Sequence, residues 1–296
     1  MTTLSCQEIA ANGVRLNCPG TWRLNEFNPT HLLLSEGDGL KLEVKWGRSR
    51  NPGSSKAHLR RLGKIHRRKF RIATNSGVVP DNWHTAVSTF ESTGFHWEGQ
   101  VYNGMGFLLH CPVCRTDTLI QFYLKSGETP ASHCADILAS YRDHPTDGNH
   151  LWNLFGIRAL IPGSMSLIGH RFEPGFIHLE FKEKRQRLSL YRWGPASVLL
   201  NQQNFREFAV SAVQAAADIA PRTMTLNGHD TLEWKSNRET TPVMRMWNRL
   251  LPTPSHHWMR IWHHRPKNRI MGICSSDSAC IDERKMERIC ETYETR

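Results

Sequence analysis

The sequence predicts an α+β protein made of two tandem, similar domains, each built on an antiparallel sheet flanked by helices. Three observations lead to this prediction: an internal repeat, stretches that alternate apolar and polar residues, and helical stretches that follow them in each half. The chain has 296 residues, of which 39% are hydrophobic and 22% charged, so it is long enough for two domains with cores of ordinary size.

The repeat is clearest near the start of each half. Residues 13–24 read G-V-R-L-N-C-P-G-T-W-R-L and return at 156–167 as G-I-R-A-L-I-P-G-S-M-S-L. The halves also end alike, with I-L-A-S-Y at 137–141 and I-C-E-T-Y at 289–293. Two matches with similar separations indicate tandem domains over residues 1–146 and 150–296. The stretch D-H-P-T-D-G at 143–148 contains Pro and Gly and is the predicted linker.

Each half begins with a strand that leads into a Pro-Gly turn, and a hairpin follows. The hairpins are predicted from residues that alternate between a buried and an exposed face. The apolar members of this pattern are Leu40, Leu42 and Val44 in the first half and Ile177, Leu179 and Phe181 in the second. Short turns between consecutive strands favour antiparallel pairing over a parallel, doubly wound sheet.

Helices and further strands complete each half. The predicted helices span residues 54–70 in the first half and 204–220 in the second, where Pro221 ends the pattern. Strands are then expected at 118–124 and 269–274. Closing helices are expected near 131–142 and 281–293.

The opening motifs of the two halves resemble a known family. C-P-G-T-W at 18–22 and I-P-G-S-M at 161–165, each followed by a hairpin, a helix, more strands and a terminal helix, are similar to the PsbP-like family. That family is named for an extrinsic subunit of the photosynthetic oxygen-evolving complex. The resemblance covers nearly the whole chain and implies an α/β/α sandwich that binds or helps assemble other macromolecules. No functional residue of the family has a distinctive match here.

A Cys-Pro-Val-Cys step lies within F-L-L-H-C-P-V-C-R-T at 107–116. Cys111 and Cys114 can present two thiolates on one side of a tight turn, which is half of a tetrahedral Zn²⁺ site. The candidates for the remaining ligands are His110 and the pair His133 and Cys134, which lie at the start of the closing helix. A helix N-terminus there would also favour thiolate.

Three interpretations of the cysteine pair stay open. It can be half of a structural zinc site, two buried thiols without a ligand, or a redox pair. A thioredoxin-type pair opens a helix, whereas this one precedes a predicted strand, which disfavours redox chemistry. The aligned residues of the second half are Arg265 and Asn268, so the fold itself does not require the cysteines.

A basic segment spans residues 48–71 and contains no Asp or Glu. Its outward face on a helix would suit the phosphates of a nucleic acid or an acidic protein, although a solvated helix face is the alternative. The predicted polyanion-binding residues are Arg60, Arg61, Lys64, Arg67, Arg68, Lys69 and Arg71.

Two further clusters carry weaker signals. Residues 255–266, S-H-H-W-M-R-I-W-H-H-R-P, combine four histidines with Trp258 and Trp262 and are interpreted as a strand with one buried aromatic face. Cys274 and Cys280 could form another half of a metal site. No Gly-rich phosphate loop, G-x-S-x-G or H-E-x-x-H motif occurs, and no carboxylate pair suggests acid–base catalysis.

Charge and cysteine usage suggest a compartment and a kind of partner. The formal net charge is +11, which favours an acidic protein partner, with nucleic acid as an alternative. No apolar run is long enough to span a membrane, and the first residues do not resemble a secretory signal, so the cytoplasm is expected. Eight cysteines there would stay reduced unless they bind metal or take part in redox chemistry.

The function predicted from these features is a non-catalytic cytoplasmic binding or assembly protein made of two repeats, with a structural zinc in the first. One alternative is a nucleic-acid or polyanion binder that uses residues 48–71. The other is a redox or small-molecule enzyme that uses Cys111 and Cys114.

Overall fold

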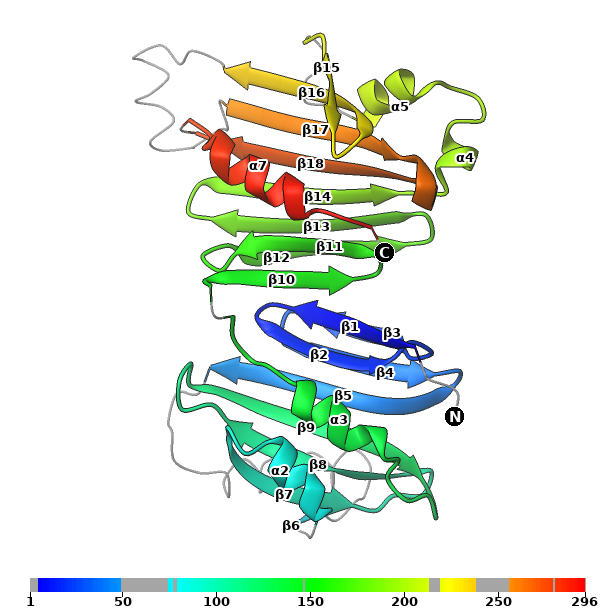
Figure 1. The fold of residues 1–296 in the computed structure, drawn as a ribbon, viewed down its shortest axis with the longest axis vertical. Helices are drawn as coiled ribbons and strands as arrows, with labels where there is room; N and C mark the ends of the chain where they lie inside the picture. Colours follow the sequence, from blue (N-terminus) through cyan, green and yellow to red (C-terminus); the bar gives the residue numbers. More distant parts are fainter. Residues whose placement is uncertain are drawn as a thin grey trace. The chain divides into compact units, whose positions relative to one another are not determined.

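The structure of the chain is a computed structural model that describes residues 5–48, 74–76, 79–145, 147–212, 219–237, 256–278 and 280–295. It divides into two compact units, Met1–Asp147 and Gly148–Arg296. Each unit contains a β-hairpin and a seven-stranded antiparallel sheet (Figure 1).

In the first unit, the hairpin pairs β1 (Cys6–Ala11) with β2 (Val14–Pro19). The order of strands across the sheet is β3 (Arg23–Asn28), β4 (His31–Glu36), β5 (Gly39–Arg48), β9 (Thr116–Lys125), β8 (Tyr102–His110), β7 (Glu91–Trp97) and β6 (Thr74–Ser76). The described helices of this unit are α2 (Asp81–Ala86) and α3 (His133–Ser140).

In the second unit, the hairpin pairs β10 (Asn149–Leu154) with β11 (Ile157–Pro162). The order of strands across the sheet is β12 (Ser166–Glu173), β13 (Phe176–Glu183), β14 (Gln186–Trp193), β18 (Arg269–Asp277), β17 (His256–His264), β16 (His229–Asn237) and β15 (Arg222–Leu226). The described helical segments are α4 (Ala196–Leu199), α5 (Phe205–Ala212), the 3-10 turn η2 (Arg265–Lys267) and α7 (Glu283–Thr292).

The two sheets have the same strand order when their strands are matched in sequence. In both sheets, three consecutive strands lie side by side, β3 to β5 in the first unit and β12 to β14 in the second. The last strand of the unit, β9 or β18, comes next, and the other three strands follow in reverse order of sequence. The opening hairpins match as well, because each turns through two residues with positive φ, Asn12-Gly13 and Phe155-Gly156. Such turns suit the right-handed twist of a two-stranded hairpin.

The core of the first unit lies between its sheet and the short helices α2 and α3, which lie over one face of the sheet in Figure 1. Trp83 of α2 is 2% exposed, and its ring centroid lies 5.0 Å from that of Phe122 and 6.5 Å from that of Phe107. On α3, the buried residues Ile137 and Leu138 continue this contact surface. Burial of apolar side chains of this size contributes about 1.5–3 kcal/mol each.

A buried polar network crosses the same sheet. The carboxylate of Glu43 accepts hydrogen bonds from Gln121, from Tyr123 at 2.8 Å and from His31 at 2.9 Å, and it also pairs with Lys45. Burial raises the pKa of Glu43, but the hydrogen bonds from His31, Lys45 and Tyr123 outweigh it and hold the pKa well below its usual range. The network therefore stabilises the ionised carboxylate.

The predicted α+β class and the α/β/α sandwich are wrong. The described residues are mostly antiparallel strand, and the described α-helices are between four and ten residues long. Several individual elements are nevertheless confirmed. The strands predicted at 118–124 and 269–274 are β9 and β18, and the closing helices are α3 and α7. Ile177, Leu179 and Phe181 form the buried face of β13 as expected.

The predicted basic helix at 54–70 lies outside the described residues. The same holds for the polyanion-binding candidates Arg60, Arg61, Lys64, Arg67, Arg68, Lys69 and Arg71. Of the helix predicted at 204–220, residues 205–212 form α5, whereas residues 219 and 220 are described and not helical, so the predicted end at Pro221 is wrong. Among the described helices, none has the length and apolar character needed to cross a bilayer.

Candidate metal site

The turn between β8 and β9 presents the cysteine pair. Its ends are closed by a hydrogen bond of 2.9 Å from the backbone N–H of Cys111 to the carbonyl of Thr116. The N–H of Arg115 donates to the carbonyl of Cys111 at 3.0 Å, and Arg115 takes a positive φ of 57°. This tight turn directs the Cys111 and Cys114 side chains to one side.

The segment that follows α3 is held beside this turn by two anchors. The hydroxyl of Tyr141, which is fully buried, lies 2.7 Å from the hydroxyl of Thr118 on β9. The backbone of Arg142 forms an isolated antiparallel bridge to Arg15 on β2, with both hydrogen bonds at 2.9 Å. Asp143 and His144 come directly after these anchors, so the two anchors determine where their side chains lie.

Together the two segments bring four potential metal ligands into one group. The thiol sulfurs of Cys111 and Cys114, a carboxylate oxygen of Asp143 and a ring nitrogen of His144 all lie within 4.8 Å of one another. The sulfur of Cys114 is 3.0 Å from Oδ2 of Asp143, and the sulfur of Cys111 is 3.7 Å from Nδ1 of His144. Cys111 and Asp143 are buried, whereas the other two side chains are half-buried.

The surroundings of Cys114 favour the neutral thiol when no cation is bound. Burial raises its pKa to about 12, and although Thr116 opposes this effect, the hydrogen bond to Asp143 adds to the rise. A thiolate beside a carboxylate in this position would need a cation to offset the charge. The arrangement can therefore hold a metal ion, and it disfavours a free, reactive thiolate.

The other predicted ligands lie elsewhere in the first unit. Nδ1 of His110 is 2.7 Å from a carboxylate oxygen of Asp117, its neighbour across the β8–β9 pair. The ring of His133 packs edge-on against Trp22 with a centroid distance of 5.6 Å. Cys134 is 3% exposed, and burial raises the pKa of its thiol to about 12. None of these three residues is a member of the group around Cys111.

Asp143 and His144 were missed because they belong to the stretch interpreted as a linker. A signal for them exists in the repeat, since the I-L-A-S-Y and I-C-E-T-Y motifs place Tyr141 and Tyr293 at equivalent positions. Residues directly after a buried tyrosine anchor are fixed in space. The position of Tyr141 in the repeat therefore marks Asp143 and His144 as ligand candidates.

The second unit lacks these ligand types at the matching positions. Its β17–β18 turn, residues 265–268, is shorter than the β8–β9 turn, residues 111–116, and contains no cysteine. The bridge between Arg158 and Glu294 matches the one between Arg15 and Arg142, so Thr295 stands where the first unit has Asp143. The same fold therefore forms without the metal ligands, which indicates that they are an addition to the scaffold.

The weaker clusters of the sequence have structural roles in the second unit. Trp258 and Trp262 are both 2% exposed on β17, which confirms the strand with a buried aromatic face. Between them, the guanidinium of Arg260 lies over the Trp258 ring at 4.7 Å. Cys274 packs against the apolar cluster beneath α5, and Cys280 is exposed.

Comparisons with known proteins assign no family. No protein-family model matches the chain, and no curated protein matches it significantly. Among solved structures, a protein from Bacteroides thetaiotaomicron VPI-5482 aligns over 51% of each chain with 10% identity and a TM-score of 0.30. MucB, alone and in complex with MucA(peri), aligns over 98% of this chain and 86% of its own with 8% identity. The TM-scores are 0.22 and 0.20, and scores this low do not establish a common fold.

Proposed function

We propose that this chain is a non-catalytic binding protein of two related units, in which a zinc ion stabilises the first unit. The observation that carries the proposal is the convergence of Cys111, Cys114, Asp143 and His144 from two separate segments. A zinc ion on these four residues would join the β8–β9 turn to the segment after α3. Structural zinc sites contribute to folding stability in this way.

Zinc is the metal that the ligand types favour. Two thiolates and an imidazole suit borderline-soft ions and disfavour Mg²⁺ and Ca²⁺, which prefer oxygen. Zinc bonds of about 2.0–2.3 Å place tetrahedral ligand atoms roughly 3.3–3.8 Å apart. The Cys111–His144 separation of 3.7 Å falls in this range, and all four ligand atoms lie within 4.8 Å of one another. Asp143 lies closer than this to Cys114, at 3.0 Å, and to His144, at 2.7 Å, so a bound ion would replace these two hydrogen bonds and move the groups apart.

The site supports a structural role better than a catalytic one. Four protein ligands fill a tetrahedral coordination shell, whereas catalytic zinc keeps one position for water or substrate. A redox role is also disfavoured, because the neutral Cys114 thiol lies beside Asp143 and the pair lies in a turn between strands. The cytoplasmic location stays part of the proposal, because a reducing compartment would keep the zinc-binding thiols available.

The net charge of +11 supports an acidic macromolecule as the partner. The segment that concentrates this charge, residues 48–71, extends almost entirely beyond the described residues, so a polyanion-binding role for it stays a prediction from the sequence. The likeness to the PsbP-like family is also a prediction from the sequence alone.

Metal analysis of the full-length protein, purified without chelators, tests the zinc site. We expect about one zinc per chain in the wild type and a loss of most of it in Cys111→Ser and in Asp143→Asn. Cys280→Ser is the matched control, because Cys280 is an exposed thiol outside the group. Absence of zinc from the wild type, or equal zinc content in all variants, would refute the proposal.

A further inference from the structure

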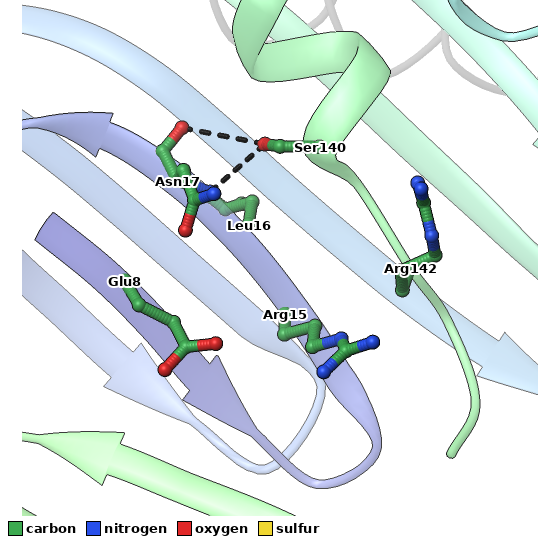
Figure 2. Close-up of a pocket in the computed structure, with 6 residues that line it drawn as sticks. All are labelled: Glu8, Arg15, Leu16, Asn17, Ser140 and Arg142. Carbon is green, nitrogen blue, oxygen red and sulfur yellow. Dashed lines mark hydrogen bonds between the residues drawn. The ribbon is translucent and has the colours of Figure 1, made fainter. Parts of the chain in front are cut away.

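A polar hollow lies where α3 meets the opening hairpin of the first unit. Its volume is about 240 Å³, and Figure 2 shows its lining side chains. They come from β1, from β2, and from the end of α3 and the residues after it. The lining residues are Glu8, Arg15, Leu16, Asn17, Ser140 and Arg142.

Two arginines with exposed side chains, Arg15 and Arg142, line this hollow. Arg15 and Arg142 form an antiparallel bridge, and residues directly opposite in such a pair hold their Cβ atoms about 4.5–5.5 Å apart. The backbone bridge, with both hydrogen bonds at 2.9 Å, fixes the two residues opposite each other and so places two positive charges in one lining.

Both guanidinium groups have N–H donors that no described residue accepts from. Nη1 of Arg142 donates to the carbonyls of Ala139 and Tyr141 at 2.9 and 2.7 Å, which leaves the donors on Nε and Nη2. No described residue accepts a hydrogen bond from the guanidinium of Arg15. The side-chain amide of Asn17 adds another donor type to the lining.

The second unit provides an internal comparison. The same bridge there joins Arg158 to Glu294, so the facing charges are opposite. The structural hydrogen bond is common to both units: the N–H of Asn17 donates to the Ser140 hydroxyl at 2.9 Å, and the N–H of Leu160 donates to the Thr292 hydroxyl at 3.1 Å.

Two other lining positions are also polar in the first unit and apolar in the second. Pairing of the hairpin strands matches Glu8 and Asn17 of the first unit to Leu151 and Leu160 of the second. The scaffold therefore forms with two leucines and a neutralised pair at these places. The polar and positively charged lining of the first hollow is specific to the first unit.

We propose that this hollow binds the oxyanion group of a small ligand, a carboxylate or a phosphate, through Arg15 and Arg142. Guanidinium groups match both anions with paired, charge-assisted hydrogen bonds. The anion would offset the positive charge that the two arginines bring to the lining. Because Glu8 offsets one of the two positive charges, the lining suits a single oxyanion group and not a polyanion.

Titration of the full-length protein with inorganic phosphate and, separately, with acetate tests this site. Chloride is used to hold the ionic strength constant, because exposed ion pairing depends on salt. The readout is the NMR signal of each arginine Nε–H. We expect saturable shifts of Arg15 and Arg142, and a response to only one of the two anions identifies its chemical class. A lack of saturable shifts with both anions overturns the proposal.

Charge-changing variants separate a site from general attraction. Arg142→Glu copies the second unit, so we expect it to fold and to bind the anion at least about tenfold more weakly. Arg15→Gln should weaken binding in the same way and guards against a folding defect in the first variant. Arg23→Glu makes the same change in net charge at an exposed residue of the same unit. Equal weakening by Arg23→Glu would show general electrostatics and overturn the site.

Discussion

Removal of one hydroxyl group, by Tyr141→Phe, should lower the stability of the first unit without affecting that of the second. It should also weaken zinc binding. Tyr141 is fully buried, and its hydroxyl lies 2.7 Å from that of Thr118, which is 2% exposed. Loss of a buried hydrogen bond that leaves its partner unsatisfied costs about 1–3 kcal/mol. We therefore expect the free energy of unfolding of the first unit to fall by that amount.

The expected loss of zinc affinity follows from the position of Tyr141 just before two of the ligands. Asp143 and His144 come two and three residues after Tyr141, so the same hydroxyl helps to place half of the ligand set. If the looser placement of these ligands reduces the free energy of zinc binding by about 1.4 kcal/mol, zinc affinity falls tenfold. The full-length variant keeps all four ligands, so this change would report positioning and not ligand removal.

The second unit supplies the matched control, Tyr293→Phe. Tyr293 is 2% exposed, and its hydroxyl donates to the carbonyl of Tyr191 at 2.7 Å. Hydrogen exchange at increasing urea resolves the two units, and competition with a chromophoric chelator gives the zinc affinity. Tyr293→Phe should destabilise the second unit and leave zinc binding unchanged. An equal effect of both variants on zinc, or none from Tyr141→Phe, would refute the reasoning.

Three further predictions concern pH and packing. Because burial raises the pKa of Cys114 to about 12, zinc must displace its proton, so the apparent zinc affinity should rise at least about tenfold per pH unit between about pH 6 and 8 in chelator competition. The folded pKa of Glu43 is lowered, so its contribution to stability is present above about pH 4.5 and lost as the pH falls. Urea unfolding of Glu43→Gln should therefore show a weaker loss of stability in acid than the wild type. A methyl group at Gly106 would overlap the backbone oxygen of Ile120, so Gly106→Ala should cost about 1–3 kcal/mol in urea unfolding, whereas Gly47→Ala, in open space on the same sheet, should be nearly neutral.

Local patterns in the sequence predicted those parts of the fold that depend on neighbouring residues. The repeat identified matching hairpins, and their Asn12-Gly13 and Phe155-Gly156 turns match in backbone conformation. The alternation in 176–181 predicted which face of β13 is buried. These signals reflect turn geometry and the two-residue period of a strand, both of which a short stretch of sequence contains.

The extent of the sheets could not be predicted in the same way. A strand such as β9 is stabilised by partners far along the chain, since it pairs with β5 on one side and β8 on the other. Local propensity does not contain that information, whereas helical spacing is visible within one segment. The helical patterns were therefore easier to recognise than the strand pairing, and the fold class predicted from them was wrong.

The candidate site shows the same division between local and distant information. The spacing of Cys111 and Cys114 within one turn was sufficient to identify them as a possible pair of ligands. Asp143 and His144 reach them because Tyr141 is anchored to Thr118 and the backbone of Arg142 pairs with Arg15, which lies near the other end of the first unit's sequence. The sequence does not reveal these long-range contacts. It therefore pointed to His133 and Cys134, which lie at the start of the closing helix.

Zinc K-edge X-ray absorption of the full-length protein tests the central claim most directly, because it reports which atoms surround the metal. The account predicts two sulfur atoms at about 2.3 Å and two nitrogen or oxygen atoms at about 2.0–2.2 Å. A shell with three or more sulfur atoms would contradict the ligand set Cys111, Cys114, Asp143 and His144. A shell of nitrogen and oxygen alone would show that the zinc lies elsewhere.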